Sequence, residues 1–260
     1  MKTMFKNDLT DRIEQGLNAA REVLKSFTPG NVATEYKSGG DPVTAADRAV
    51  DDVLKERLVQ GNEGWLSEET ADDLRRLACR RVWIVDPLDG TREFVAGIPE
   101  WAISIGYVED GNPVAGGICN PQTGETFIGC VGQGVTYNGK SAAIGQRSTL
   151  TGALVLASRS EVNRGEWKRF SNEPFEVKPV GSVAYKLALV AAGLADATWT
   201  LTPKNEWDVA AGVALMNAAG GTAYLLGGDR PSFNNQDPLI SGLIAHPTSL
   251  RDSVGATLDL

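Results

Sequence analysis

Residues 82–91 read Val82-Trp83-Ile84-Val85-Asp86-Pro87-Leu88-Asp89-Gly90-Thr91, and the prediction of the architecture starts from them. The first four are apolar, as in a strand buried on both faces, and the proline, aspartates and glycine that follow indicate a turn. Ligands of α/β proteins bind at the carboxyl ends of strands. Asp86 and Asp89 stand at such an end, and two carboxylates so close repel each other unless a cation lies between them. The stretch therefore predicts a cation site at the edge of an α/β sheet.

The overall composition narrows the possible chemistry. The chain has 260 residues, 25 basic and 33 acidic side chains, a net charge of −8 and one histidine. An acidic chain is poorly suited to bind nucleic-acid backbones, so we expect no nucleic-acid polymer as a partner. The single histidine, His246, excludes a multi-histidine zinc site and has no evident nucleophile nearby. The chemistry must then depend on carboxylates, hydroxyls or backbone groups.

The cysteines and the apolar residues predict the environment of the protein. Cys79, Cys119 and Cys130 are odd in number and lack C-x-x-C spacing, and we recognise no N-terminal signal sequence. We therefore expect reduced thiols in the cytoplasm. No apolar run approaches the ~20 residues that span a bilayer, so we expect no membrane association. With 42% hydrophobic residues, the chain is long enough for one or two packed domains.

Hydrophobic spacing and turn signals predict the remaining elements. Apolar residues at helical spacing indicate a helix over residues 8–27, and Thr44 is placed to cap a second one. Alternation over residues 101–107, followed by repeated turn signals, predicts an antiparallel meander. Beyond residue 150 the pattern predicts strands over 154–157, 175–180 and 197–201, and helices over 182–193 and 206–220. We place a soft boundary there, between an α+β domain of residues 1–150 and an α/β domain of residues 151–260.

Five acidic residues lie beside turns or element ends, and each has two interpretations. They are Asp47, Glu68, Asp86, Asp89 and Asp208. As a cluster they would offer only oxygen ligands, which favour Mg²⁺, Mn²⁺ or Ca²⁺ over zinc. Individually, Asp47 and Asp208 could complete capping arrangements, Glu68 could belong to a solvated surface pair, and Asp86 and Asp89 could form an Asx-rich turn.

Four segments, in this order along the chain, resemble signatures of the inositol monophosphatase superfamily. Residues 37–47 are similar to its loop K-x-x-x-D-x-V-T-x-x-D, and residues 67–70 to G-E-E-[ST], with Ser67 in place of the glycine. Residues 83–91 are similar to W-I-[IV]-D-P-[IL]-D-G-T, and residues 207–212 to W-D-x-A-[AG]-[AG]. The resemblance implies a layered αβαβα sandwich and a Mg²⁺-dependent phosphatase of small phosphorylated metabolites. It also implies inhibition by lithium and a homodimer.

Carried over position by position, the resemblance implies a role for each residue of the site. Glu68, Asp86 and the carbonyl of Leu88 would bind a first Mg²⁺, and Asp86, Asp89 and Asp208 a second. Glu68 would help to bind a weaker third ion, and Mn²⁺ could substitute. Asp47 and Thr91, assisted by Glu68, would orient and deprotonate the attacking water. The substrate would be bound by Asp89, Gly90, Thr91, Gly181, Ser182 and Lys186.

The resemblance leaves the substrate open. Residues 89–94 are similar to the D-G-T-[KR]-E-[FY] of 3′(2′),5′-bisphosphate nucleotidases, and Leu201 stands where inositol phosphatases usually have a glutamate. Arg159 and Lys186 could bind a second phosphate or be ordinary solvated cations. Lys37 could belong to the functional loop or be only a charge on a flexible loop. An inositol monophosphate or similar polyol phosphate and adenosine 3′,5′-bisphosphate are the main alternatives, ahead of histidinol phosphate and fructose 1,6-bisphosphate. A non-catalytic metal-binding relative is disfavoured because Asp47 and Thr91 are both present.

One further motif is a misleading match. Residues 134–141 fit the phosphate-binding pattern G-x-x-x-x-G-K-[ST], but no helical pattern follows Ser141. Asn138-Gly139 instead predicts a hairpin turn.

Overall fold

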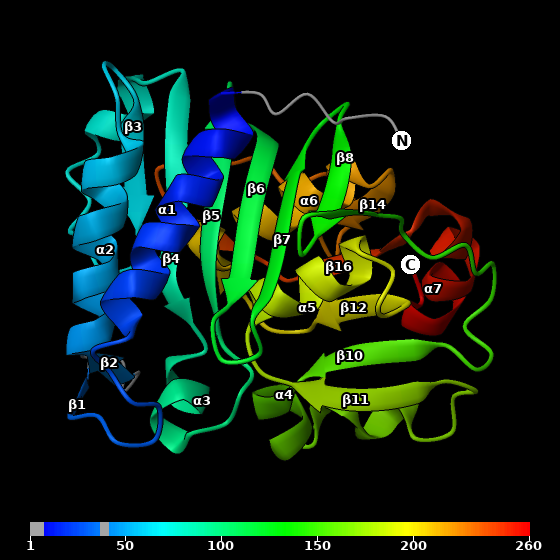
Figure 1. Ribbon diagram of the computed structural model, residues 1–260. Coiled ribbons are helices and arrows are strands. Elements are labelled where there is room, and N and C mark those ends of the chain that lie inside the picture. The colour runs from blue at the N-terminus through cyan, green and yellow to red at the C-terminus, as the bar shows by residue number, and fades with distance from the viewer. Residues whose placement is uncertain (1–7, 37–41) are drawn as a thin grey trace.

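The computed structural model describes residues 8–36 and 42–260, whose elements stack in five layers, α-β-α-β-α (Figure 1). The layered sandwich predicted from the sequence is therefore confirmed. Helices α1 (Asp8–Leu24) and α2 (Ala45–Leu58) cover one face of a seven-stranded sheet. Helices α5 (Val183–Ala191) and α6 (Glu206–Ala218) form the middle layer, between the seven-stranded sheet and a five-stranded sheet. The outer layer contains the short helices α4 (Arg159–Asn163), η2 (Glu166–Phe170) and α7 (Arg251–Leu258).

The seven-stranded sheet carries the predicted meander. Only the first pair, β3 and β4, is parallel, and all later pairs are antiparallel. Asn138 and Gly139 have φ of 48° and 74° and form the tight turn between β8 and β9, so residues 134–141 are a hairpin as predicted. In spatial order the strands are β3 (Gly64–Ser67), β4 (Arg81–Asp89), β5 (Ala102–Glu109), β6 (Asn112–Asn120), β7 (Glu125–Cys130), β8 (Gly134–Tyr137) and β9 (Lys140–Ala142).

The prediction that the strand ends before Asp86 was wrong. β4 continues to Asp89, with Asp86 opposite Ser104 and Asp89 opposite Ala102, and its register with β5 shifts between the two aspartates. Pro87 lies inside this irregularity, where its missing N–H costs no ladder hydrogen bond. Such bulges redirect side chains, and this one occurs where the two carboxylates leave the sheet. The short helix α3 (Thr91–Ala96) begins directly after it.

The five-stranded sheet contains both parallel and antiparallel strand pairs. β10 is parallel to β11 and β12, whereas β16 is antiparallel to β12 and β14. The predicted helices over 182–193 and 206–220 end two residues early, because Gly193 and Gly220 adopt positive φ of 73° and 75°. The first helix ends at Leu24 rather than Phe27. The strands, in spatial order, are β11 (Glu176–Val180), β10 (Leu154–Ser158), β12 (Ala197–Thr200), β16 (Leu243–Pro247) and β14 (Gly221–Tyr224).

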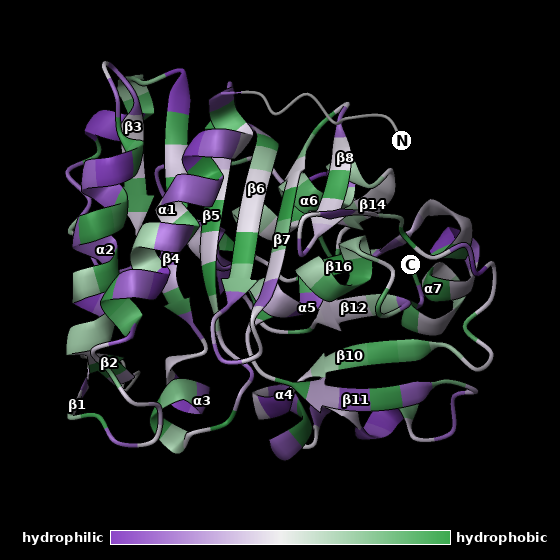
Figure 2. Ribbon diagram, viewed as in Figure 1, coloured by the Kyte–Doolittle hydropathy of each residue, from purple (hydrophilic) through white to green (hydrophobic). Residues whose placement is uncertain are grey.

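Three apolar clusters fill the spaces between the layers, and polar residues of α1 and α2 face outward (Figure 2). Helix α6 packs very closely on the larger sheet: a Cβ atom at Gly116 would lie 2.4 Å from the carbonyl oxygen of Ala211. The glycine thus permits a helix approach that any side chain would prevent. No helix among the described residues is long and apolar enough to cross a bilayer.

Candidate active site

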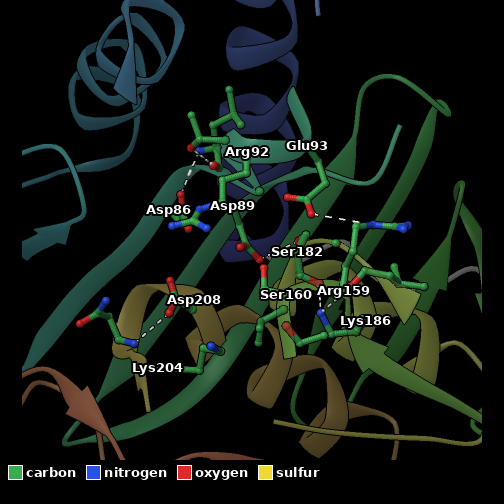
Figure 3. A pocket seen from close by; sticks show the side chains of 18 of the residues that line it. Asp86, Asp89, Arg92, Glu93, Arg159, Ser160, Ser182, Lys186, Lys204 and Asp208 are labelled. Atoms are coloured by element: carbon green, nitrogen blue, oxygen red, sulfur yellow. Dashed lines mark hydrogen bonds and ion pairs between the residues drawn. The ribbon is translucent and has the colours of Figure 1, made fainter. Parts of the chain in front are cut away.

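A cavity of about 300 Å³ lies where the end of β4 and the start of α3 face the N-termini of α5 and α6 (Figure 3). Acidic side chains come from β4, from the segment after β3 and from α6, and basic side chains come mainly from the C-terminal half of the chain. The predicted site residues that line it are Glu68, Asp86, Leu88, Asp89, Gly90, Thr91, Gly181, Ser182, Lys186 and Asp208. Lys37 and the loop up to Asp41 lie outside the described residues.

The centre of the cavity is a cluster of three aspartates. Each of Asp86, Asp89 and Asp208 contributes a carboxylate oxygen, and these oxygens lie within 4.8 Å of one another. Burial, reinforced by repulsion from neighbouring carboxylates, raises the pKa of Asp86 and of Asp208 well above the usual range. Glu68 lines the same cavity and contributes to the repulsion, although it is not within the 4.8 Å group. Charge of opposite sign is needed to stabilise all of these groups in ionised form.

Each aspartate of the cluster is oriented through one oxygen. Asp86 Oδ1 accepts a hydrogen bond from the backbone N–H of Leu88 at 2.9 Å, and Asp208 Oδ2 accepts one from Asn205 N at 2.8 Å. Asp89 Oδ2 accepts two, from Ser182 Oγ and Ala184 N, both at 2.6 Å. Within the described part of the chain, the second oxygen of each accepts no hydrogen bond. The two interpretations of Asp208, helix cap or ligand, are therefore compatible.

Asp47 also uses its two carboxylate oxygens for different contacts. Its Oδ2 closes the capping box of α2 by accepting hydrogen bonds from Thr44 N at 2.8 Å and Thr44 Oγ1 at 2.6 Å. Its Oδ1 lies 3.0 Å from Thr91 Oγ1, which is also 3.0 Å from the carbonyl oxygen of Leu88. The single hydroxyl proton can serve only one of these acceptors at a time. Asp47 is buried and is connected to the cavity through Thr91.

The N-terminus of α5 forms the facing wall. Ser182, with a strained φ of 53°, caps the helix by accepting a hydrogen bond from Tyr185 N at 2.9 Å while donating to Asp89. Lys186 is only 2% exposed and donates to the carbonyl oxygens of Ser182 at 2.8 Å and Val180 at 3.2 Å. Burial lowers the pKa of Lys186 to about 8, against the opposing effect of Asp89. Lys186 therefore stabilises, through these two hydrogen bonds, the strained turn that orients Asp89.

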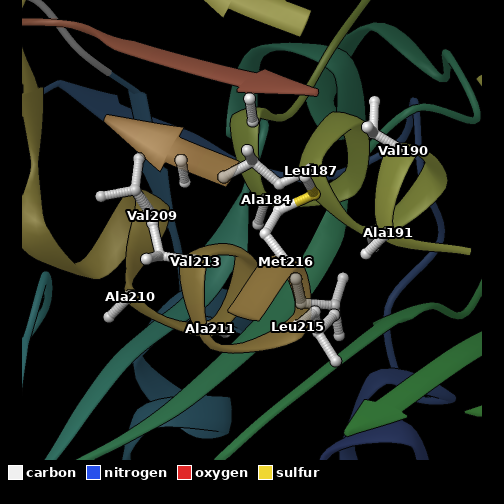
Figure 4. Packing of buried hydrophobic residues seen from close by; sticks show 14 of the residues in the cluster. Ala184, Leu187, Val190, Ala191, Val209, Ala210, Ala211, Val213, Leu215 and Met216 are labelled. Atoms are coloured by element: carbon white, nitrogen blue, oxygen red, sulfur yellow. The ribbon is translucent and has the colours of Figure 1, made fainter. Parts of the chain in front are cut away.

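Packing between α5 and α6 fixes the two helix N-termini relative to each other (Figure 4). A Cβ atom at Gly212 would lie 2.4 Å from Leu187 Cδ1, so the helices are in close contact. Ser182 and Asp208, one from each helix start, are consequently held at a defined separation across the cavity.

Two residues of this region, Lys204 and Glu161, were not predicted from the sequence, and a third, Arg159, is paired within the protein. Arg159 forms an ion pair with Glu100 and lies 4.0 Å from Glu93, so its charge is already matched. Lys204 lines the cavity, and the fully buried Glu161 holds the segment before it. Neither residue belongs to a recognised motif. Their only sequence signal was proximity to the Glu206-Trp207-Asp208 segment and to Arg159.

The donor set fits a hard divalent cation. The cluster offers carboxylate oxygens and no nitrogen or sulfur, the set that Mg²⁺ prefers. Among residues 8–36 and 42–260, no lysine or arginine forms an ion pair with Asp86, Asp89 or Asp208. Lys186 and Lys204 act on Asp89 only without forming an ion pair, so bound cations would supply the direct partners that these carboxylates lack.

Known proteins resemble this chain over most of its length. The inositol monophosphatase family matches residues 7–256. The chain is 32% identical to "Inositol-1-monophosphatase" of Rhizobium meliloti (strain 1021), over 77% of this chain and 79% of that protein. The "extragenic suppressor protein suhB" of Bartonella henselae superposes with a TM-score of 0.82 at 27% identity, covering 97% and 98% of the two chains. CysQ of Bacteroides thetaiotaomicron superposes with a TM-score of 0.77 at 26% identity, covering 94% and 99%.

Proposed function

Because this chain belongs to the inositol monophosphatase family, and is thus a phosphoric monoester hydrolase, we propose that it cleaves a small phosphate monoester in a Mg²⁺-dependent reaction. The first substrate we propose is an inositol monophosphate or a similar polyol phosphate. The observation that carries the proposal is the cluster of Asp86, Asp89 and Asp208 beside the Thr91–Asp47 pair. The aspartate cluster offers a cation site, and the Thr91–Asp47 pair beside it offers a proton acceptor.

The proposed metal ligands are Glu68, Asp86, the carbonyl of Leu88, Asp89 and Asp208. Two or three bound Mg²⁺ ions, or Mn²⁺ as a substitute, would lower the pKa of the attacking water and offset charge on the phosphoryl and leaving-group oxygens. Ser182 and Ala184 N–H hold Asp89 through Oδ2 and leave Oδ1 for the cluster. Asn205 N–H holds Asp208 in the same manner.

Thr91 and Asp47 would perform the proton transfer. With its own proton donated to Asp47 Oδ1 at 3.0 Å, Thr91 Oγ1 can accept a hydrogen bond from the attacking water. The water proton then passes through the hydroxyl to the carboxylate, which Thr44 holds in place through two hydrogen bonds. The substrate phosphate would lie at the backbone N–H groups of Gly90 and Thr91, where α3 begins.

A specific observation favours a second candidate, adenosine 3′,5′-bisphosphate. Three cations from the C-terminal half of the chain, Arg159, Lys186 and Lys204, line the same cavity as the acidic cluster. An inositol monophosphate carries no second anion for such a wall. The structural similarity to CysQ, a bacterial member of the inositol monophosphatase family, is compatible with either substrate.

A phosphate-release panel tests the proposal. The purified protein is assayed with Mg²⁺, and with EDTA as the control, on inositol 1-phosphate, adenosine 3′,5′-bisphosphate, histidinol phosphate and fructose 1,6-bisphosphate. We expect Mg²⁺-dependent release that is highest for one of the first two. A strong preference for the adenosine compound would replace the first substrate with the second. Absence of release from all four would favour a non-catalytic metal-binding relative.

We also propose a cytoplasmic homodimer that lithium inhibits. The cytoplasmic location is supported by three cysteines that form no disulfide with one another, Cys79, Cys119 and Cys130. Residues 1–150 and 151–260 are proposed as two domains, because the seven-stranded sheet lies in the first range and the five-stranded sheet in the second. Light scattering and a lithium titration of phosphate release test the dimer and the inhibition.

A further inference from the structure

Of the three cations that line the cavity from the C-terminal half, two are already engaged by the protein. Arg159 is paired with Glu100, and the Lys186 amine donates to two backbone carbonyl oxygens from an almost fully buried position. Lys204 differs from both. Its Nζ donates to Thr202 Oγ1 at 3.1 Å, and no carboxylate of the described chain lies within ion-pair distance of it. The charge of Lys204 is thus available to a ligand.

The position of Lys204 is set by a buried relay. Thr202 Oγ1 accepts the hydrogen bond from Lys204 and donates its own proton to Glu161 Oε1 at 2.9 Å. Glu161 is 0% exposed, and the same oxygen accepts the backbone N–H groups of Leu201 at 3.1 Å and Thr202 at 3.2 Å. Glu161 therefore fixes both the turn before Lys204 and the orientation of the Thr202 hydroxyl.

Glu161, the buried end of this relay, stays ionised. Burial acts to raise the pKa of Glu161, but hydrogen bonds from Thr200, Trp167 and Thr202 outweigh it and leave that pKa below its ordinary value. An ionised Glu161 holds the Thr202 proton, so the lone pairs of the hydroxyl face Lys204. Figure 3 shows the Lys204 side chain near Asp208, and both residues line the cavity. Ionised Glu161 acts on Lys204 electrostatically, although the two form no ion pair. Among the described residues, Lys204 Nζ donates one hydrogen bond, to Thr202, so two of its three N–H donors are left for an anion in the cavity once cations offset the aspartates.

We propose that Lys204 is a specificity-determining residue that binds a second phosphate group on the organic part of the substrate. Glu161 acts as a positioning residue through Thr202. This inference rests on the proposed function, because it assumes that the phosphate to be cleaved lies at the aspartate cluster. It assigns the second anion to Lys204 rather than to Arg159 or Lys186, which the sequence had suggested.

Matched substrate pairs test the role of Lys204. Phosphate release is measured on adenosine 3′,5′-bisphosphate against adenosine 3′-monophosphate, and on inositol 1,4-bisphosphate against inositol 1-phosphate. We expect the wild type to prefer the bisphosphate in at least one pair. Lys204→Met should lower kcat/KM for that bisphosphate by about 10- to 100-fold, mainly through KM, because a charge-assisted hydrogen bond is lost. The monophosphates should change by less than about 3-fold, which is within ordinary surface effects.

Two variants of Thr202 test the relay. Thr202→Ser keeps the hydroxyl and should behave as the wild type, whereas Thr202→Val should raise KM for the preferred bisphosphate with little change in kcat. Glu161→Gln should resemble Thr202→Val, and the Thr202 pair decides the question if Glu161→Gln does not fold. Lys140→Met, at an exposed position on β9, is the matched charge control and should change nothing.

The outcomes separate the two proposals. If the wild type releases phosphate but prefers neither bisphosphate, or if Lys204→Met affects both members of a pair equally, the role of Lys204 is wrong while the phosphatase stands. Equal behaviour of Thr202→Ser and Thr202→Val would overturn the relay. If the wild type with Mg²⁺ releases no phosphate from any of these substrates, the proposed function itself fails.

Discussion

Replacing Asp89 with asparagine should stabilise the protein without metal and destabilise it relative to wild type with metal. At 4.8 Å, two carboxylate charges repel by about 3.5 kcal/mol at an effective dielectric constant of 20. Asp89 faces two such partners, but the raised pKa of Asp86 and of Asp208 shows that protonation relieves part of the repulsion. The amide oxygen of asparagine can still accept the hydrogen bonds from Ser182 and Ala184. We therefore expect a net gain of about 1–2 kcal/mol in EDTA.

Magnesium should reverse this order. A ligand at 100 times its dissociation constant stabilises the folded state by about 2.7 kcal/mol, and the variant lacks one of the proposed ligands. Thermal unfolding in EDTA should then place the Tm of Asp89→Asn about 2–6 °C above that of wild type, and saturating Mg²⁺ should place it below. The rate of phosphate release by Asp89→Asn should fall by more than 100-fold, because substitutions of residues that only support metal ligands already cost ~10- to 100-fold.

The pH dependence of the metal-free protein has a defined sign. The pKa of Asp86 and of Asp208 is higher in the folded protein than in the unfolded chain, where it is about 3.9. The unfolded chain therefore binds fewer protons above that pH, so stability should fall as the pH rises from about 4 through the folded pKa values. Mg²⁺ should remove this slope, and Asp89→Asn should reduce it.

Asp52→Asn, an exposed substitution on α2, is the matched control and should alter neither Tm nor its response to Mg²⁺. If Asp89→Asn is less stable than wild type in EDTA, the three carboxylates are not in electrostatic conflict and the expected gain in stability is wrong. A full Mg²⁺-induced shift together with full activity in the variant would refute the ligand assignment.

Three other changes have definite expected outcomes. Thr91→Val removes the hydroxyl beside Asp47 and should lower kcat by about 10²- to 10⁴-fold in the phosphate-release assay, with the Mg²⁺-induced Tm shift retained. Ser182→Ala removes a donor to Asp89 and should raise the Mg²⁺ concentration for half-maximal activity by about 10- to 100-fold; an unchanged Mg²⁺ titration would contradict that role. Glu63→Gln, which leaves Arg12 unpaired, should lower the free energy of unfolding at pH 7 by roughly 2–4 kcal/mol in urea titrations. Burial opposes ionisation of Glu63, but hydrogen bonds from Arg12 and Trp83 lower its pKa overall. In wild type this contribution to stability should therefore be lost as the pH falls below about 4.3. The free energies of unfolding of wild type and Glu63→Gln should become equal at such low pH.

The sequence predicted those features of the fold that depend on neighbouring residues. Alternation and turn residues were sufficient for the meander, and Asn138-Gly139 for its last hairpin. The end of β4 was misjudged because a bulge and a turn use the same residues, and only the pairing of Asp89 with Ala102 distinguishes them. Helix ends were placed too late because the apolar pattern continues into Gly193 and Gly220, whose positive φ stops the helix.

The site was predictable where family motifs covered it. That Asp208 joins Asp86 depends on contacts between α6 and the sheet, which no local pattern reveals, so the resemblance was needed to find it. No motif indicated which cations are engaged. Arg159 and Glu100 are 59 residues apart, and the burial of Lys186 is invisible in a residue type that is normally exposed.

The geometry of the aspartate cluster depends on packing that lies far from any ligand. Asp208 reaches β4 because α6 crosses β5 and β6 over Gly106 and Gly116, where a Cβ atom would lie 2.9 Å and 2.4 Å from α6 atoms. On its other side α6 contacts α5 through Gly212, and α5 carries the Ser182 that orients Asp89. These contacts therefore place Asp208 and Ser182, and Ser182 in turn orients Asp89. An ordinary helix-sheet spacing would separate carboxylates that repel one another, so the close packing maintains an arrangement that their charges alone would oppose.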